Sequence, residues 1–129
     1  MEISDKQNQK IAAIAKKFSL SLVLLFGSRV SGPLNQESDF DVAYLPKKPL
    51  DSEDEIQINY EFTNIFEGNK VKVISLEKTP PFFMKKIFDN HKILFCSDMQ
   101  VYYSYRIYAF KIYVEFKEKM GCISNNLKT

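Results

Sequence analysis

The sequence has few of the residues that build disulfide frameworks or zinc sites. Its 129 residues include only two cysteines, Cys96 and Cys122, and one histidine, His91. The two cysteines form no metal-ligand pattern, so free thiols are the simplest interpretation. A single histidine in a predicted turn is more often structural than catalytic, and we assign it no role.

Long apolar runs and a strong excess of one charge are also lacking. No run approaches the roughly 20 apolar residues that cross a bilayer, and the first residues, Met1–Lys6, do not have the basic-then-apolar pattern of a secretory signal. The formal net charge is +2, with both signs mixed along the chain, which gives no strong argument for nucleic-acid binding. We therefore expect a cytoplasmic protein without a membrane partner.

What is present indicates one folded domain with a modest core. Hydrophobic residues make up 45% of the sequence and charged residues 26%, as in globular proteins. A chain of this length favours a single domain. We expect that domain to cover residues 1–121, with a flexible tail over residues 122–129.

The most informative stretch covers residues 25–45. The apolar run Ser21–Phe26, which is typical of a strand buried on both faces, ends at Gly27 and Ser28. After a polar turn, Asp39 and Asp41 lie one residue apart in a second short apolar run. In a strand these two carboxylates would project from the same face. Carboxylates held side by side repel each other unless a cation lies between them, and their hard oxygens suit Mg²⁺.

The Gly-Ser pair before this turn suits a phosphate. Gly27 has no side chain to keep a phosphate from the backbone, and Ser28 supplies a hydroxyl. Backbone N–H groups that follow could also face an anion if a short helix begins there. Each piece alone is usually a turn or a solvated strand face. Together and in this order they indicate a metal and a phosphate on facing walls, as phosphoryl and nucleotidyl transfer require.

The two pieces together resemble the signature of a known family. Residues 26–29 (Phe-Gly-Ser-Arg) followed by residues 38–41 (Ser-Asp-Phe-Asp) are similar to the motif of minimal nucleotidyltransferases (MNT), in the DNA polymerase β-like nucleotidyltransferase superfamily. The resemblance implies an α/β fold, with a small, mixed, twisted sheet and helices mainly on one face. Many MNT proteins are antitoxins paired with a HEPN-domain toxin, and some transfer AMP from ATP to a tyrosine of that toxin.

The resemblance also implies roles for individual residues. Gly27 and Ser28 would bind the triphosphate of the nucleotide, with help from Arg29. Asp39 and Asp41 would bind Mg²⁺ and act as the catalytic carboxylates. A HEPN toxin would be the protein partner, and ATP would be the substrate.

The third expected strand, Lys70–Leu76, departs from the family pattern. Family members usually carry a third acidic residue there, and Lys72 falls at that position. Unless it faces solvent, a lysine would weaken occupancy of the metal site by like-charge repulsion, although it could pair with Asp39 or Asp41, or contact a triphosphate. We expect nucleotide binding to tolerate this change better than chemistry does.

Two functions therefore stay open. The first is an antitoxin that transfers AMP from Mg-ATP to a tyrosine hydroxyl of a HEPN toxin. The second is a catalytically impaired nucleotide-binding module that neutralises the toxin by association. Transfer to a small molecule, as in aminoglycoside nucleotidyltransferases, is disfavoured because the chain has little room for an additional acceptor-binding region.

Helix signals complete the expected fold. Three capping boxes predict helix starts, at Ser4 with Gln7, Ser52 with Glu55, and Ser97 with Gln100. A short helix is expected over residues 82–89, followed by an edge strand over residues 92–96. The last helix is expected over about residues 98–119, with Gly121 as its stop. Its many tyrosines and phenylalanines lie on more than one face, so the helix is either buried on two sides or forms a partner-binding surface.

Overall fold

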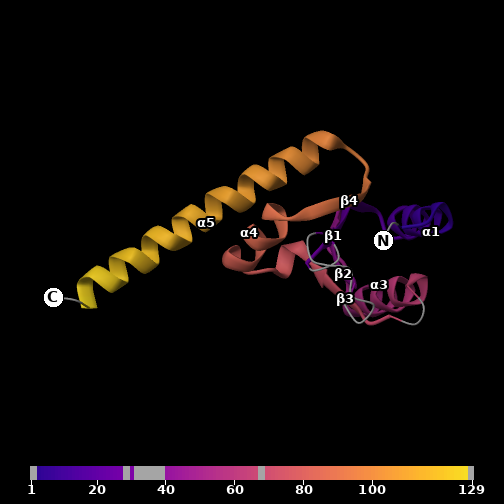
Figure 1. Ribbon diagram of the computed structural model, residues 1–129, viewed down its shortest axis with the longest axis horizontal. Coiled ribbons are helices and arrows are strands. Elements are labelled where there is room, and N and C mark those ends of the chain that lie inside the picture. Colours follow the sequence, from indigo (N-terminus) through magenta and orange to yellow (C-terminus); the bar gives the residue numbers. More distant parts are fainter. Residues whose placement is uncertain (1–2, 28–29, 31–39, 67–68, 128–129) are drawn as a thin grey trace.

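The computed structural model describes residues 3–27, 30, 40–66 and 69–127 (Figure 1). The elements in chain order are α1 (Asp5–Lys17), β1 (Leu20–Phe26), β2 (Phe40–Pro46), α3 (Ser52–Ile65), β3 (Val71–Ser75), the 3-10 turn η1 (Leu76–Lys78), α4 (Pro81–Asp89), β4 (His91–Cys96) and α5 (Met99–Leu127). The strands form one sheet in the order β3-β2-β1-β4. β1 is antiparallel to β2 and β4, whereas β2 and β3 are parallel. The expected α/β class with a small mixed sheet is confirmed.

Helices cover both faces of this sheet (Figure 1). Val23 and Leu25 of β1 join the core beneath α1 and α3, while Leu22 and Leu24 join the core beneath α4 and α5. All seven residues of β1 are buried. The expectation of helices mainly on one face was therefore wrong, because a strand with no polar face must be covered on both sides.

The first helix starts as the sequence predicts, and two others start one residue away from the prediction. Ser4 and Gln7 form the expected capping box of α1. At α3 the cap is Asp51, whose carboxylate accepts a hydrogen bond from the backbone N–H of Asp54 at 2.7 Å. At α5 the backbone N–H of Gln100 donates to the side chain of Asp98 at 2.9 Å. A carboxylate caps at least as well as serine and also interacts favourably with the helix dipole.

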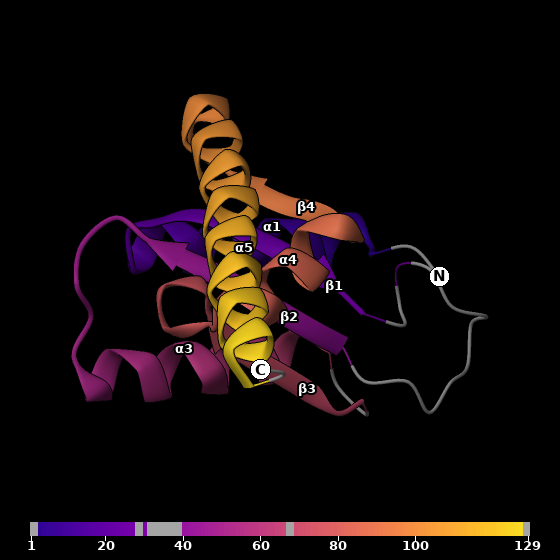
Figure 2. The same ribbon diagram turned by 90° about the vertical axis from the view of Figure 1, so that its left-hand side faces the viewer.

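The C-terminal helix is longer than the sequence predicts. α5 has 29 residues and continues through Gly121, the predicted stop, to Leu127. Gly121 does not adopt the positive φ of a helix-ending glycine. A glycine in a helix interior costs only about 1 kcal/mol, which does not by itself end the helix. α5 is about 43 Å long by its rise per residue, and it projects beyond the sheet (Figures 1 and 2).

The sequence has no apolar run long enough to cross a bilayer, and the helices can be checked for the same property. In the part of the chain that the structure describes, no helix combines the length and the apolar character needed to cross a bilayer.

Candidate functional site

A row of paired residues crosses the sheet where β1 ends and β2 begins. Phe26 of β1 pairs with Asp41 of β2 on one side and with His91 of β4 on the other. Asp41 in turn pairs with Lys72 of β3. Paired residues in neighbouring strands point to the same face of the sheet, here the face covered by α4 and α5, because Phe26 belongs to the core on that side. Two opposite charges and one imidazole are thus placed along a single row.

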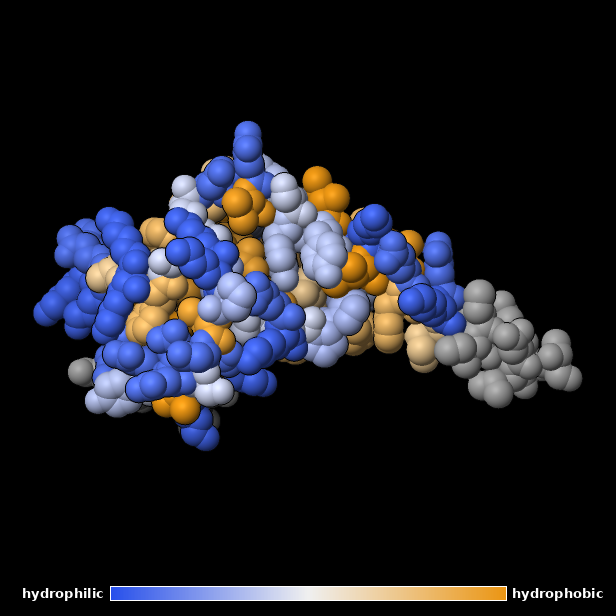
Figure 3. All heavy atoms as spheres, turned by 180° about the vertical axis from the view of Figure 1, so that it is seen from behind, coloured by the Kyte–Doolittle hydropathy of each residue, from blue (hydrophilic) through white to orange (hydrophobic). Residues whose placement is uncertain are grey.

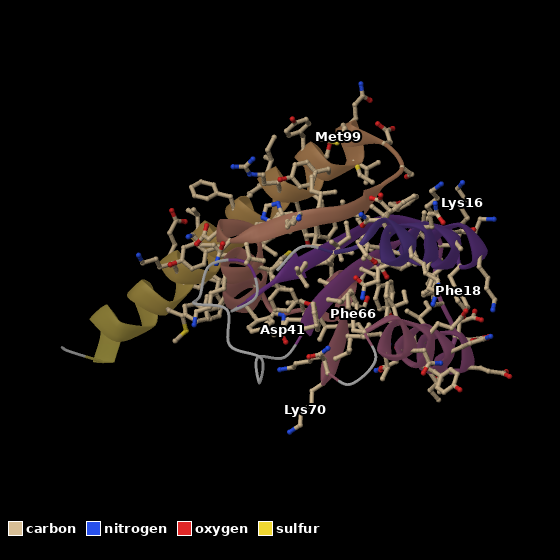
Figure 4. The ribbon with its side chains drawn as sticks, turned by 45° about the vertical axis from the view of Figure 1, so that its right-hand side comes forward. Lys16, Phe18, Asp41, Phe66, Lys70 and Met99 are labelled. Carbon is tan, nitrogen blue, oxygen red and sulfur yellow. The ribbon has the colours of Figure 1, made fainter. Side chains whose placement is uncertain are left out.

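The main chain at Gly27 lies directly against the carboxylate of Asp41. Gly27 has a φ of +85°, which side-chain-bearing residues rarely adopt. A β-carbon built at Gly27 would overlap Oδ2 of Asp41 and would lie 3.3 Å from its Cγ. Only glycine therefore fits here, for both conformational and steric reasons. Figure 4 shows Asp41 on the strands, at the opposite end of the sheet from Phe18.

Replacing Gly27 with alanine tests this close approach. We expect a loss of about 1–3 kcal/mol in the free energy of unfolding from the strained φ alone, together with weaker ATP binding because the Asp41 carboxylate must move. Urea denaturation and calorimetry measure the two effects. Gly121→Ala is the matched control, because Gly121 has open space around it and an ordinary helical φ. That control should stabilise the protein by about 0.5–1 kcal/mol, and equal behaviour of the two variants would contradict the packing described here.

Lys72 lies immediately beside Asp41 in the sheet. The two residues are register partners in the parallel pair β2–β3, and strands so paired are about 4.8 Å apart. The Lys72 side chain is exposed and Asp41 is half-buried. A positively charged side chain therefore starts from the same face as the carboxylate, within reach of any anion or metal that binds at Asp41.

The other predicted site residues, Ser28, Arg29 and Asp39, lie outside the described residues. Within the described part of the chain, no group of three or more acidic, cysteine or histidine side chains could hold a metal ion. One described carboxylate with an adjacent lysine does not fit a metal site formed by protein ligands alone. It does fit Mg²⁺ that arrives with a nucleotide, since that ion is usually held by one or two carboxylates and the substrate phosphates.

The family is shown by the sequence from the middle of α1 to the start of α5. Residues 9–100 match the model of the polymerase β nucleotidyltransferase family. The chain belongs to this family. The matched region contains the whole sheet and the Gly27–Asp41 contact. No curated protein sequence matches the chain.

Solved structures share the nucleotidyltransferase fold with this chain. A toxin–antitoxin structure with AMP-PNP matches at a TM-score of 0.77 and 18% identity, covering 95% of this chain and 98% of its own. A tri-AMPylated Shewanella oneidensis HEPN toxin in complex with an MNT antitoxin matches at 0.73 and 17% identity, covering 96% and 98%. The spectinomycin adenyltransferase of Enterococcus faecialis, with ATP and spectinomycin, matches at 0.55 and 14% identity, covering 72% and 56%.

His91 connects β4 to two helices. Its Nδ1 lies 2.9 Å from the carbonyl oxygen of Phe88, and its Nε2 lies 2.7 Å from the hydroxyl of Tyr102. A carbonyl can only accept, so Nδ1 carries the proton and the neutral ring accepts from Tyr102 at Nε2. Burial lowers the pKa of His91; the hydrogen bond to Phe88 opposes this, and the charge of Arg106 adds to it. The sequence alone could not reveal these contacts, because Tyr102 belongs to the next element.

The lowered pKa of His91 predicts a stability that depends on pH. The unfolded chain binds a proton at His91 near pH 6.5, whereas the folded chain does so only at lower pH. Stability is therefore complete above about pH 6.5 and falls as the pH drops from there towards the folded-state pKa. Thermal unfolding between pH 7.5 and 5.5 should show this fall in the wild type and little of it in His91→Gln. Because His91 is the sole histidine, an unchanged fall in the variant would assign the effect to another group.

Proposed function

We propose that this protein is an MNT antitoxin that transfers AMP from Mg-ATP to a tyrosine hydroxyl of a partner HEPN toxin. The observation that carries the proposal is the contact between the Gly27 main chain and the Asp41 carboxylate. It brings Gly27, the first residue of the Gly-Ser pair, against the Asp41 carboxylate, although 13 residues lie between the two in the sequence. Similar folds with bound AMP-PNP and with an AMPylated toxin support the choice of nucleotide and acceptor.

The proposed roles follow from the chemistry of each residue. Gly27 and Ser28 hold the β- and γ-phosphates, and Arg29 assists by its positive charge. Asp39 and Asp41 hold Mg²⁺, which when bound neutralises charge on the triphosphate. The tyrosine oxygen forms a bond to the α-phosphorus, and the bond from that phosphorus to the oxygen that bridges it to the β-phosphorus breaks. Pyrophosphate leaves, and the phenolic proton passes to water.

A second candidate function is favoured by Lys72. Lys72 is the register partner of Asp41, at the position where the family usually has a third carboxylate, and its ammonium group cannot accept a proton from the attacking hydroxyl while charged. In this alternative the protein binds nucleotide but transfers AMP poorly, and it neutralises the toxin by association.

Calorimetry and labelling of the wild type separate these functions. ATP binding is measured with and without Mg²⁺, and the full chain is then incubated with a HEPN protein from the same genome and with ATP labelled at the α-phosphate. Label on a partner tyrosine, and none from γ-labelled ATP, supports transfer. ATP binding and a stable complex without label support the second function. If ATP does not bind with Mg²⁺ present, both candidate functions are wrong, because each of them requires the protein to bind a nucleotide.

A further inference from the structure

Most of α5 lies beyond the residues that match the nucleotidyltransferase family model. The match ends at residue 100, the second residue of α5. The toxin–antitoxin structure with AMP-PNP, in contrast, matches 95% of this chain. The unmatched 5% of 129 residues is about six residues, far fewer than the 29 of α5. Most of α5 is thus shared with that toxin–antitoxin fold, although the family's domain does not include it.

One face of α5 packs on the domain. Tyr102 and Ala109 are buried against the core beneath α4 and α5, and Tyr105 and Ile112 pack against the same core. The Phe88 ring of α4 lies 6.3 Å from Tyr102 and 6.2 Å from Tyr105, measured between centroids. This face explains how α5 is held, and it accounts for only part of the helix's apolar side chains.

A second apolar stripe on α5 is exposed. It consists of Met99, Tyr103, Ile107 and Phe110, which are 45%, 53%, 69% and 61% exposed. Their spacing of four, four and three residues places them along one side of the helix. We call these four residues the outer stripe. Hydrophobic surface is visible where α5 leaves the body of the molecule (Figure 3).

The outer stripe borders a groove between α4 and α5. The groove has a volume of about 550 Å³, and Tyr103, Ile107 and Phe110 form much of its α5 side. Lys85 and Asp89, an ion pair at 2.6 Å, lie on its α4 side. Aromatic and aliphatic side chains beside charges of both signs are typical of the apolar centre and polar rim of a protein interface.

We infer that the outer stripe and this groove dock a helix of the partner toxin. This inference rests on the proposed function, which supplies the partner. The outer stripe has apolar side chains at i, i+4, i+8 and i+11, and such a ridge packs between the side-chain rows of a second helix. Side chains of that second helix would enter the groove between α4 and α5. A helical toxin is favoured over a second copy of this chain because α5 accompanies the toxin–antitoxin fold and lies outside the family's shared domain.

Ile107→Glu tests this docking surface. A carboxylate in the centre of the stripe should weaken binding to a HEPN protein from the same genome by roughly 30-fold or more, as for a central interface residue. Ile56→Glu is the matched control, because Ile56 is an isoleucine on α3 that is 71% exposed. Both full-length variants should keep the wild-type melting temperature and ATP binding. Titration by calorimetry gives the dissociation constants, and light scattering after gel filtration gives the oligomeric state of each protein alone.

Each other outcome overturns the inference in a distinct way. If Ile107→Glu binds the HEPN protein as tightly as Ile56→Glu does, the docking surface is wrong while the proposed partner stands. If the wild type alone is a dimer that Ile107→Glu dissociates, the stripe binds a second copy instead. If the wild type binds no HEPN protein, the partner in the proposed function is wrong and this surface with it.

Discussion

Replacing Asp41 with asparagine should remove Mg²⁺-dependent ATP binding and lower AMP transfer by roughly 100-fold or more, since even the outer partners of metal ligands contribute 10–100-fold. Asparagine keeps the shape of the side chain beside Gly27 and removes its charge. The half-buried carboxylate would otherwise hold a cation together with the nucleotide phosphates. Calorimetry with Mg-ATP and transfer of label from α-labelled ATP measure the two losses.

Asp5→Asn is a suitable control for this experiment. Asp5 is an exposed carboxylate at the start of α1, and α1 covers the face of the sheet opposite Asp41. Both variants should unfold at the wild-type temperature within a few degrees. Unchanged Mg-ATP binding in Asp41→Asn would show that the nucleotide binds elsewhere. The contact between Gly27 and Asp41 would then no longer support the proposed function.

Replacing Lys72 with aspartate should raise AMP transfer by roughly tenfold or more, because the change replaces like-charge repulsion of a bound cation with attraction at short range. The new carboxylate would stand beside Asp41, since the two positions are register partners on one face of the sheet. Affinity for Mn²⁺, used as a probe for Mg²⁺ and measured by paramagnetic resonance with a non-hydrolysable ATP analogue, should rise in parallel.

Lys70→Asp separates this local effect from a change in net charge. Lys70 is also exposed, and it precedes β3 and has no register partner in β2; Figure 4 shows its side chain pointing away from the sheet. A gain with Lys72→Asp and none with Lys70→Asp would place the third site at residue 72. No gain with Lys72→Asp would count against that placement. Equal gains in the two variants would show that the effect comes from the change in net charge and not from the position of residue 72.

The helix starts show how accurately a local sequence pattern predicts where a helix begins. The capping box of Ser4 and Gln7 involves residues three positions apart, and it is confirmed. Serines 52 and 97 have similar partners, yet Asp51 and Asp98 supply the cap oxygens. The pattern therefore located each helix start to within one or two residues, and competition between neighbouring caps decided the final residue. In the same way, Gly121 had the residue type of a helix stop without the positive φ that makes one.

The residue pattern alone determined the buried strand β1, the edge strand β4 and the family resemblance, because apolar runs and short motifs are local properties. The α/β class followed from that resemblance. Only the tertiary structure decided that Gly27 lies against Asp41 and that Lys72 is the register partner of that carboxylate. It also decided that helices cover both faces of the sheet and that one stripe of α5 remains exposed. These features depend on pairing between distant strands, whose register is set jointly by hydrogen bonds and by the packing of both faces, and no short stretch of sequence contains that information.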